Sequence, residues 1–290
     1  MAQENLQINS GDKNIKQHKM KKLLHLLIYK LINLKYGKIV LKKYGHNVMN
    51  FKKIILHNNI KYSFIAPNDL CEYRIATFAT KEPETLSWID SFDDETTFWD
   101  IGANVGLYSI YAAKSKKSNV YAFEPSFFNL EILSRNIYLN SLQSKITIIP
   151  IPLSNFTNTN SFQMTSTQWG GALSTFGANI DQNGKPIKEI FEYNIIGTTM
   201  DEIINNLNIP MPNFIKIDVD GIEHLILSGG KYILSKVKSL LIEIDDNFIE
   251  QSQKTEKLLT EAGLVLFKKC NIDSINQFNQ WWIRPTNKSI

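Results

Sequence analysis

The sequence has few cysteines, no long apolar run and, near its start, almost no acidic residues. Only Cys71 and Cys270 occur among 290 residues. They match no metal-ligand or redox spacing, and two reduced thiols are typical of a cytoplasmic protein. The apolar run Leu23–Leu34 contains His25 and Lys30. It is shorter than the roughly 20 residues that cross a membrane, and its position does not fit a secretory signal.

The scarcity of acidic residues leaves one strongly basic segment. From Lys13 to Asn68 there are thirteen lysines and no Asp or Glu, whereas the whole chain has a net charge of +4. The chain from Asp69 onward is therefore acidic. We expect Lys16–Lys43 to form a basic amphipathic helix, broken near Gly37, that either packs on the body of the protein or makes weak contact with an anionic membrane. A nucleic-acid partner is not expected because the body is acidic and lacks an Asn/Asp-Pro-Pro-aromatic motif.

The pattern of apolar runs predicts three regions: a disordered tail (1–15), a helix and hairpin extension (16–80) and a catalytic domain (81–290). In the extension, two strands within Phe51–Ile65 are joined by a turn at Asn58-Asn59. From Thr97 onward, short apolar runs alternate with helical stretches, which predicts an α/β fold with a mostly parallel sheet. The last two runs suggest a terminal antiparallel pair. A polar insertion, Asn155–Tyr193, interrupts the alternation.

The stretch from Phe98 to Gly106 is the most informative one. It reads FWDIGANVG and predicts a buried strand, a turn of small residues and a helix that begins near its last glycine. Ligands of parallel sheets bind beyond the carboxyl ends of the strands. The turn therefore predicts a cofactor site made by Asp100, Gly102, Ala103, Asn104 and Gly106. Gly102 lets the backbone approach a ligand because it carries no Cβ atom.

An acidic residue at the end of the next strand indicates a nucleoside ligand. Glu124, followed by Pro125, lies 22 positions after Gly102, and a carboxylate at this place can accept hydrogen bonds from both ribose hydroxyls. A nicotinamide dinucleotide would need G-x-G-x-x-G to bind its pyrophosphate, and no third glycine is in place here. S-adenosylmethionine contains a ribose and an amino acid but no phosphate, so it fits this loop better, with Asn104 near the amino acid.

Several motifs, in this order, resemble the FkbM family of methyltransferases. They are Trp99–Gly106, Tyr108-Ser109, Phe123-Glu124-Pro125, Asn136 with Asn140, Thr199-Met200-Asp201 and Ile215–Glu223. The resemblance covers about Glu82 to Ile244, and Asp220 departs from it because the family commonly has Glu there. It implies a Rossmann-like class I methyltransferase fold with a seven-stranded sheet. It also implies S-adenosylmethionine as the donor and O-methylation of a sugar, glycan or natural-product hydroxyl.

Three carboxylates in the block IKIDVDGIE are the candidate catalytic residues. Asp218 is expected at the end of the fourth strand, on the same sheet edge as Gly102, and Asp220 and Glu223 follow it closely. Such residues can position a hydroxyl, act as a general base or bind a divalent cation; equally, they can cap a helix. Close like charges raise a carboxyl pKa, which would suit Asp218 as a base. No other motif supports a metal.

The residues leave two other functions open. One is an NAD(P)-dependent oxidoreductase on the same fold, and the other is a non-catalytic relative that keeps only cofactor binding. For the methyltransferase, we expect a small-molecule or glycan acceptor and a cytoplasmic location, with the basic segment able to contact the membrane periphery.

Overall fold

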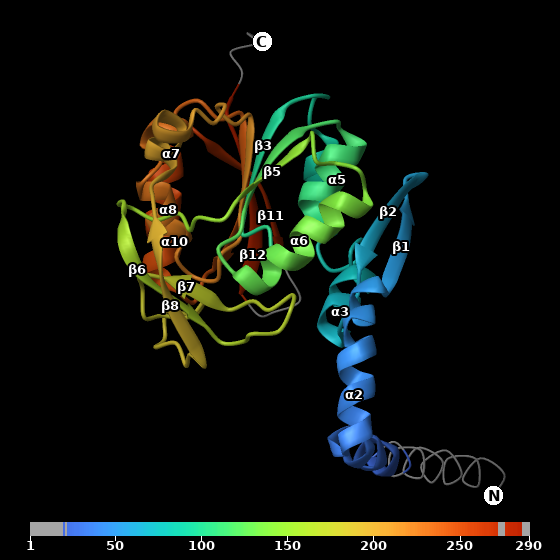
Figure 1. Cartoon of the computed structure of the whole chain (residues 1–290). Helices are drawn as coiled ribbons and strands as arrows, with labels where there is room; N and C mark the ends of the chain where they lie inside the picture. The colour runs from blue at the N-terminus through green and yellow to red at the C-terminus, as the bar shows by residue number, and fades with distance from the viewer. Residues whose placement is uncertain (1–19, 21, 272–275, 286–290) are drawn as a thin grey trace, which may run out of the picture. The chain divides into compact units, whose positions relative to one another are not determined.

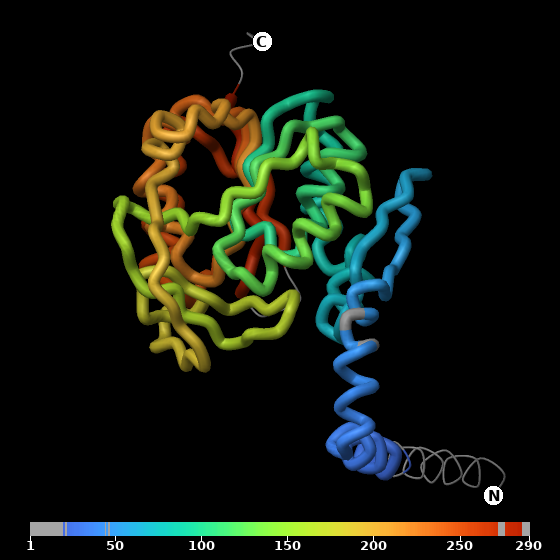
Figure 2. Tube along the Cα trace, viewed as in Figure 1, coloured from blue at the N-terminus to red at the C-terminus, as the bar shows by residue number. Residues whose placement is uncertain are grey.

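A computed structural model describes residues 20, 22–271 and 276–285, so the expected tail 1–15 lies outside the described residues. The chain divides into two compact units, with the boundary between Phe51 and Lys52. The first unit contains a helical run over 22–33, α2 (Lys35–Tyr44) and the 3-10 helix η1 (Gly45–Asn50). Its helices are interrupted at Leu34, where the backbone is extended, rather than at Gly37 as predicted (Figure 2). Within the described chain, every helix is too short or too polar to cross a membrane.

A seven-stranded sheet in the order β11-β12-β10-β9-β3-β4-β5 forms the centre of the second unit (Figure 1). Five strands run parallel, and β12 is antiparallel to both β10 and β11. This confirms the predicted Rossmann-like α/β sheet with its terminal antiparallel pair. The strands are β3 (Thr97–Ile101), β4 (Asn119–Phe123), β5 (Ile146–Ile149), β9 (Phe214–Ile217), β10 (Ser239–Asp245), β11 (Val265–Asn271) and β12 (Gln277–Ile283).

Helices cover both faces of the sheet because successive strand side chains point to opposite sides. In β3, Phe98 belongs to one hydrophobic core and Trp99 to the other. The Phe98 core includes residues of α3 (Asp69–Ala76), α4 (Pro83–Asp90), α5 (Leu107–Ser115) and α6 (Phe127–Leu139). The Trp99 core includes residues of α7 (Met200–Leu207), α8 (Glu223–Ser228), α9 (Lys231–Leu234) and α10 (Ile249–Glu261).

A hairpin of β1 (Lys52–His57) and β2 (Ile60–Ile65) begins the second unit. Its turn is the predicted one, since Asn58 and Asn59 both have positive φ. Two asparagines of α6 bind its second strand: Asn136 Oδ1 accepts from the Ile65 N–H at 2.7 Å, and Asn140 Nδ2 donates to the Ser63 carbonyl at 2.7 Å. The spacing of these two asparagines, noted in the sequence, therefore serves to hold the hairpin on the domain.

Two predictions of local structure were wrong. A single helix was expected over Ile222–Leu234, but α8 and α9 are separated at Gly229 and Gly230. A Cβ at Gly230 would lie 2.1 Å from Met200 Cε, so the close packing there requires glycine. The polar insertion, in turn, is not an irregular loop. It forms a three-stranded antiparallel sheet of β6 (Asn158–Met164), β7 (Ser174–Phe176) and β8 (Phe191–Gly197).

Candidate active site

Two pockets open at the carboxyl ends of the parallel strands, where β3 lies between β4 and β9. The strand order reverses at this point, which is where doubly wound sheets bind ligands. The first pocket contains about 580 Å³ of empty space and the second about 1000 Å³. They share the lining residues Gly102, Asn104, Ala172, Asp218 and Asp220. A ligand in one pocket is therefore separated from a ligand in the other by these few residues.

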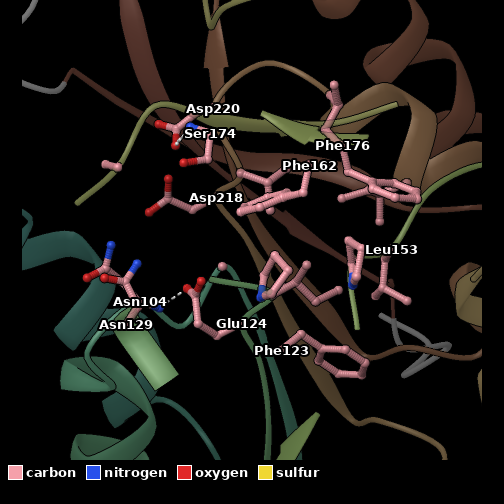
Figure 3. Close-up of a pocket in the computed structure, with 18 of the residues that line it drawn as sticks. Asn104, Phe123, Glu124, Asn129, Leu153, Phe162, Ser174, Phe176, Asp218 and Asp220 are labelled. Atoms are coloured by element: carbon pink, nitrogen blue, oxygen red, sulfur yellow. Dashed lines mark hydrogen bonds between the residues drawn. The ribbon is translucent and has the colours of Figure 1, made fainter. Parts of the chain in front are cut away.

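The first pocket is polar at one end and apolar at the other. Figure 3 shows Glu124 and Asn104 at the polar end, and Phe162, Phe176 and Leu153 around the apolar end. Both phenylalanines belong to the insertion sheet. The insertion thus completes a pocket whose other walls come from the main sheet.

Glu124 follows β4 directly, and two backbone groups hold its carboxylate. Oε2 accepts from the Asn104 N–H and Oε1 from the Ser126 N–H, each at 2.8 Å. The side chain is buried, and this burial raises the pKa of Glu124 to about 7. Each oxygen keeps a second lone pair for a ligand hydroxyl. Pro125 also lines this pocket, and its carbonyl accepts from the Tyr193 hydroxyl of β8 at 2.8 Å.

The two glycines of the β3–α5 turn have different roles. Gly102 has φ +86°, and a Cβ there would lie 1.8 Å from the Asp218 carbonyl oxygen, so the strands β3 and β9 can end side by side only with glycine. Gly106 has φ +85°, and its missing Cβ leaves room for Leu133 of α6. Gly106 lines neither pocket, whereas Ala103 lines the second pocket only.

Two asparagines connect the cofactor turn to the insertion. Asn104 Nδ2 and Asn129 Nδ2 both donate to the Gly171 carbonyl, at 2.7 and 3.0 Å. Asn129 Oδ1 also accepts from the Gly170 N–H at 2.9 Å. Asn104 was expected to face a ligand, and it lines both pockets while making this contact. Sequence analysis missed Asn129, because nothing in its surroundings marks one polar residue of α6.

Asp218 stands between the two pockets and pairs with a buried lysine. Lys216 Nζ lies 2.6 Å from Asp218 Oδ2. Burial alone would raise the pKa of Asp218, but the charge and hydrogen bond of Lys216 hold it below its usual value. The expectation that crowded carboxylates raise the pKa of Asp218 was therefore wrong. The cause is Lys216, a residue of the IKIDVDGIE block that was considered only for its resemblance. Asp218 is thus an ionised carboxylate at neutral pH.

The other two carboxylates of the block bind backbone groups. Asp220, at φ +63°, lines both pockets and accepts from the N–H groups of Leu173 and Ser174, which lead into β7. Burial and the charge of Asp218 raise the pKa of Asp220 to about 6. Glu223 lines neither pocket and accepts from the N–H groups of Val219 and Gly221. Burial raises the pKa of Glu223 to about 7. These contacts fit Asp220 and Glu223 as groups that shape the loop around Asp218.

Asp100 is likewise outside both pockets. It is buried, and its Oδ2 accepts from the Ser109 hydroxyl at 2.5 Å. Burial raises the pKa of Asp100 above its usual value. Its place under the turn makes it a support for β3 and α5, although the sequence suggested a direct cofactor contact.

The second pocket gathers charges of both signs from separate segments. Glu82, Asp218 and Glu243 have carboxylate oxygens within 4.8 Å of one another, which is an oxygen-rich set of the kind that Mg²⁺ or Ca²⁺ prefers. However, Lys81 Nζ lies 3.0 Å from Glu82, and Lys216 already pairs with Asp218. These ammonium groups neutralise the carboxylates, so the residues do not favour a divalent cation.

Glu243 differs from its neighbours in protonation. It follows the middle of β10 and is coupled to the same cluster. Burial, followed by the charges of Asp218 and Glu82, raises the pKa of Glu243 well above its usual value. Glu243 is therefore a neutral carboxylic acid at neutral pH and can donate a hydrogen bond to a ligand in this pocket. Together with Arg74 and Gln277, it gives the second pocket several groups that can bind hydroxyls.

Comparisons with known proteins place this arrangement in context. The family model described as "Methyltransferase FkbM domain" matches residues 100–273. A curated relative, the hexuronic acid methyltransferase AglP of Haloferax volcanii, is 29% identical over 180 residues. This match covers 61% of the chain and 66% of AglP, slightly less than two thirds of the relative's length.

Similar solved structures are more distant in sequence. Methyltransferase FkbM from Methylobacillus flagellatus KT is 17% identical, with a TM-score of 0.46; the match covers 74% of this chain and 55% of that one. TYW2 from M. jannaschii, solved in complex with AdoMet, is 12% identical, with a TM-score of 0.42; the match covers 81% of this chain and 87% of that one.

Proposed function

The chain belongs to the FkbM family of methyltransferases, and on this premise we propose that it transfers the methyl group of S-adenosylmethionine to a hydroxyl group of a sugar. The observation that carries the proposal is the meeting of two pockets at Asp218, with Glu124 in the first pocket and a charged, hydrogen-bonding lining in the second. One pocket suits an activated nucleoside donor and the other a polar acceptor.

The donor occupies the first pocket in this proposal. Its ribose hydroxyls donate to Glu124, the same use of a carboxylate as in dinucleotide-binding folds. Its adenine lies among Phe162, Phe176 and Leu153, because a flat aromatic base favours an apolar surface. The methionine part then extends past Gly102 toward Asp218, which brings the sulfonium methyl to the boundary with the second pocket.

The acceptor occupies the second pocket, with its reacting hydroxyl near Asp218. The hydroxyl oxygen attacks the methyl carbon, the carbon–sulfur bond breaks, and S-adenosylhomocysteine leaves as a neutral thioether. The hydroxyl proton passes to Asp218, which is available because Lys216 keeps this carboxylate ionised. Much of the rate comes from holding the two reactants in line, since the donor is already activated.

A sugar is the favoured acceptor for two reasons. The curated relative is a hexuronic acid methyltransferase, and the second pocket is lined by side chains that both donate and accept hydrogen bonds, including Arg74, Glu82, Glu243 and Gln277. A uronic-acid glycan is the first acceptor to test, because Arg74 and Lys81 supply positive charge for a carboxylate. The family membership also disfavours the oxidoreductase considered from the sequence.

The test is a methyl-transfer assay with isotope-labelled S-adenosylmethionine. Matched glucuronide and glucoside acceptors would be compared by mass spectrometry, with Asp218→Asn as the inactive control. We expect a methylated product that resists mild alkali, because a methyl ether is stable where a methyl ester is hydrolysed. An alkali-labile product would mean transfer to a carboxylate and would overturn the hydroxyl proposal. Failure of every sugar would remove the sugar as acceptor.

A further inference from the structure

The first unit exposes an unusual amount of apolar surface. Leu23, Leu24, Leu27, Ile28 and Leu31 lie on the helical run 22–33, and each keeps between 43% and 61% of its surface exposed. Tyr36, Val40 and Leu41 of α2 are exposed as well. Contiguous exposed apolar patches usually mark a surface that binds something.

These apolar residues lie along one side of each helix. Leu23, Leu27 and Leu31 are spaced by four residues, as are Leu24 and Ile28, so together they form a stripe on the run 22–33. The spacing of Tyr36 and Val40 continues the same pattern in α2. Both helices are therefore amphipathic, which is the form that lies in the plane of a membrane interface.

Lysines occupy the other side of both helices. Lys22 and Lys30 flank the leucine stripe on the first helix, and Lys35, Lys38 and Lys42 follow helical spacing on α2. The sequence contains no acidic residue between Lys13 and Asn68, so nothing within this segment neutralises these charges. Two copies joined through this segment would place like charges near one another, whereas an anionic bilayer complements the lysines and also receives the leucines.

We propose that residues 22–44 form a docking surface for an anionic phospholipid bilayer. The helices lie parallel to the membrane, with the leucine stripe among the acyl chains and the lysines at the level of the headgroups. This fits the finding that, among the described helices, none could cross a bilayer. The surface would hold the enzyme beside acceptors carried by a membrane, and it does not depend on the chemistry proposed for the active site.

The experiment is sedimentation of the full chain with vesicles of phosphatidylcholine alone and with about 30% phosphatidylglycerol. We expect the chain to sediment with the anionic vesicles and to remain largely unbound with neutral ones. Raising NaCl from about 0.05 M to about 0.5 M should release it, because salt screens the lysine–headgroup attraction. Equal binding to both vesicle types, or no binding to anionic vesicles at low salt, would overturn the proposal.

Two matched variants separate the apolar stripe from general loss of hydrophobicity. Leu27→Gln with Leu31→Gln changes the stripe, and we expect it to lower the vesicle partition coefficient by about tenfold or more. Leu26→Gln with Ile39→Gln removes two exposed apolar residues that lie between lysines, and its effect should be smaller than about twofold. Equal losses in both variants would contradict the stripe.

Two further readouts guard the interpretation. All variants should keep the wild-type affinity for S-adenosylmethionine, so a failure of vesicle binding remains separate from a failure of the proposed function. Sedimentation velocity without lipid should give a monomer. A dimer that the stripe variant abolishes would assign this face to a second copy and overturn membrane docking.

Discussion

The first pocket relies on a single carboxylate, Glu124, opposite an apolar end, whereas the second pocket collects charges of both signs from several segments of the chain. The walls of the first pocket follow strand ends of the sheet and the insertion that covers them. The second adds Arg74 from α3, Lys81 and Glu82 from before α4, and Glu243 from β10. The comparison teaches that donor recognition is built into the sheet, while acceptor recognition is assembled from surrounding segments that can vary independently.

The strongest way to break both pockets at once is Gly102→Ala. The new Cβ would lie 1.8 Å from the Asp218 carbonyl oxygen, at a backbone φ of +86° that alanine rarely adopts. Because Gly102 lines both pockets, we expect S-adenosylmethionine binding and activity to fall by more than about 100-fold, with a clear drop in melting temperature. Calorimetry and thermal unfolding would measure the two effects.

Gly263→Ala is the matched control for that substitution. It has a similar φ of +80°, but a Cβ there meets only an Arg284 side-chain nitrogen, at 3.1 Å. We expect a small loss of stability and unchanged donor affinity. If both alanine variants behaved alike, backbone strain rather than the contact of β3 with β9 would explain the importance of Gly102.

Asp218→Asn should separate the two pockets. Asparagine keeps an oxygen for Lys216 but cannot take the proton of the acceptor. We expect kcat to fall by about 10²- to 10⁴-fold, while S-adenosylmethionine affinity changes less than about threefold. Asp93→Asn, a surface carboxylate paired with Lys238, is the control and should leave both quantities unchanged. A normal kcat in Asp218→Asn would remove Asp218 as the base.

Glu223→Gln should change neither pocket directly but alter the pH dependence of stability. Burial raises the pKa of Glu223 to about 7 from a usual value of 4.5, so the native state holds a proton that the unfolded state has lost. The contribution to stability is therefore complete below about pH 4.5 and declines as pH rises toward 7.

Urea unfolding at several pH values measures this decline. We expect the wild-type free energy of unfolding to fall across that window, with Glu223 accounting for about 2 kcal/mol of the loss. The variant should show a flatter profile, because glutamine does not titrate. An identical slope in both proteins would mean that the Glu223 carboxyl is not protonated in the folded state.

The sequence predicted the sheet and the donor site better than the acceptor site. Apolar runs, the Gly102 turn and Glu124 occupy fixed places in an alternating α/β pattern, so their positions in space follow from chain order. Arg74, Lys81 and Asn129 carry no such signal, because only tertiary packing brings their segments to the strand ends. Glu243 was seen at a strand end, but its neighbours in the cluster, and hence its raised pKa, depend on side chains far away in sequence.

The insertion was the least predictable element. Its strands are rich in Asn, Thr and Ser and lack a clear apolar alternation, yet β6, β7 and β8 pair in register. Partners that stabilise them come from other segments, among them Asn104, Asn129 and Asp220. Such side chain to backbone contacts between distant residues leave no periodic pattern in the sequence.

The measurement that tests the central claim most directly is a calorimetric titration of S-adenosylmethionine into the wild-type chain, Glu124→Ala and Glu256→Ala. Glu256 is an exposed carboxylate of α10 and serves as the matched control. We predict binding to the wild type and to Glu256→Ala with equal affinity, and a loss of about 10- to 100-fold in folded Glu124→Ala, because the ribose loses charge-assisted hydrogen bonds. Undiminished binding by Glu124→Ala, or no binding by the wild type, would contradict the assignment of the first pocket to the methyl donor.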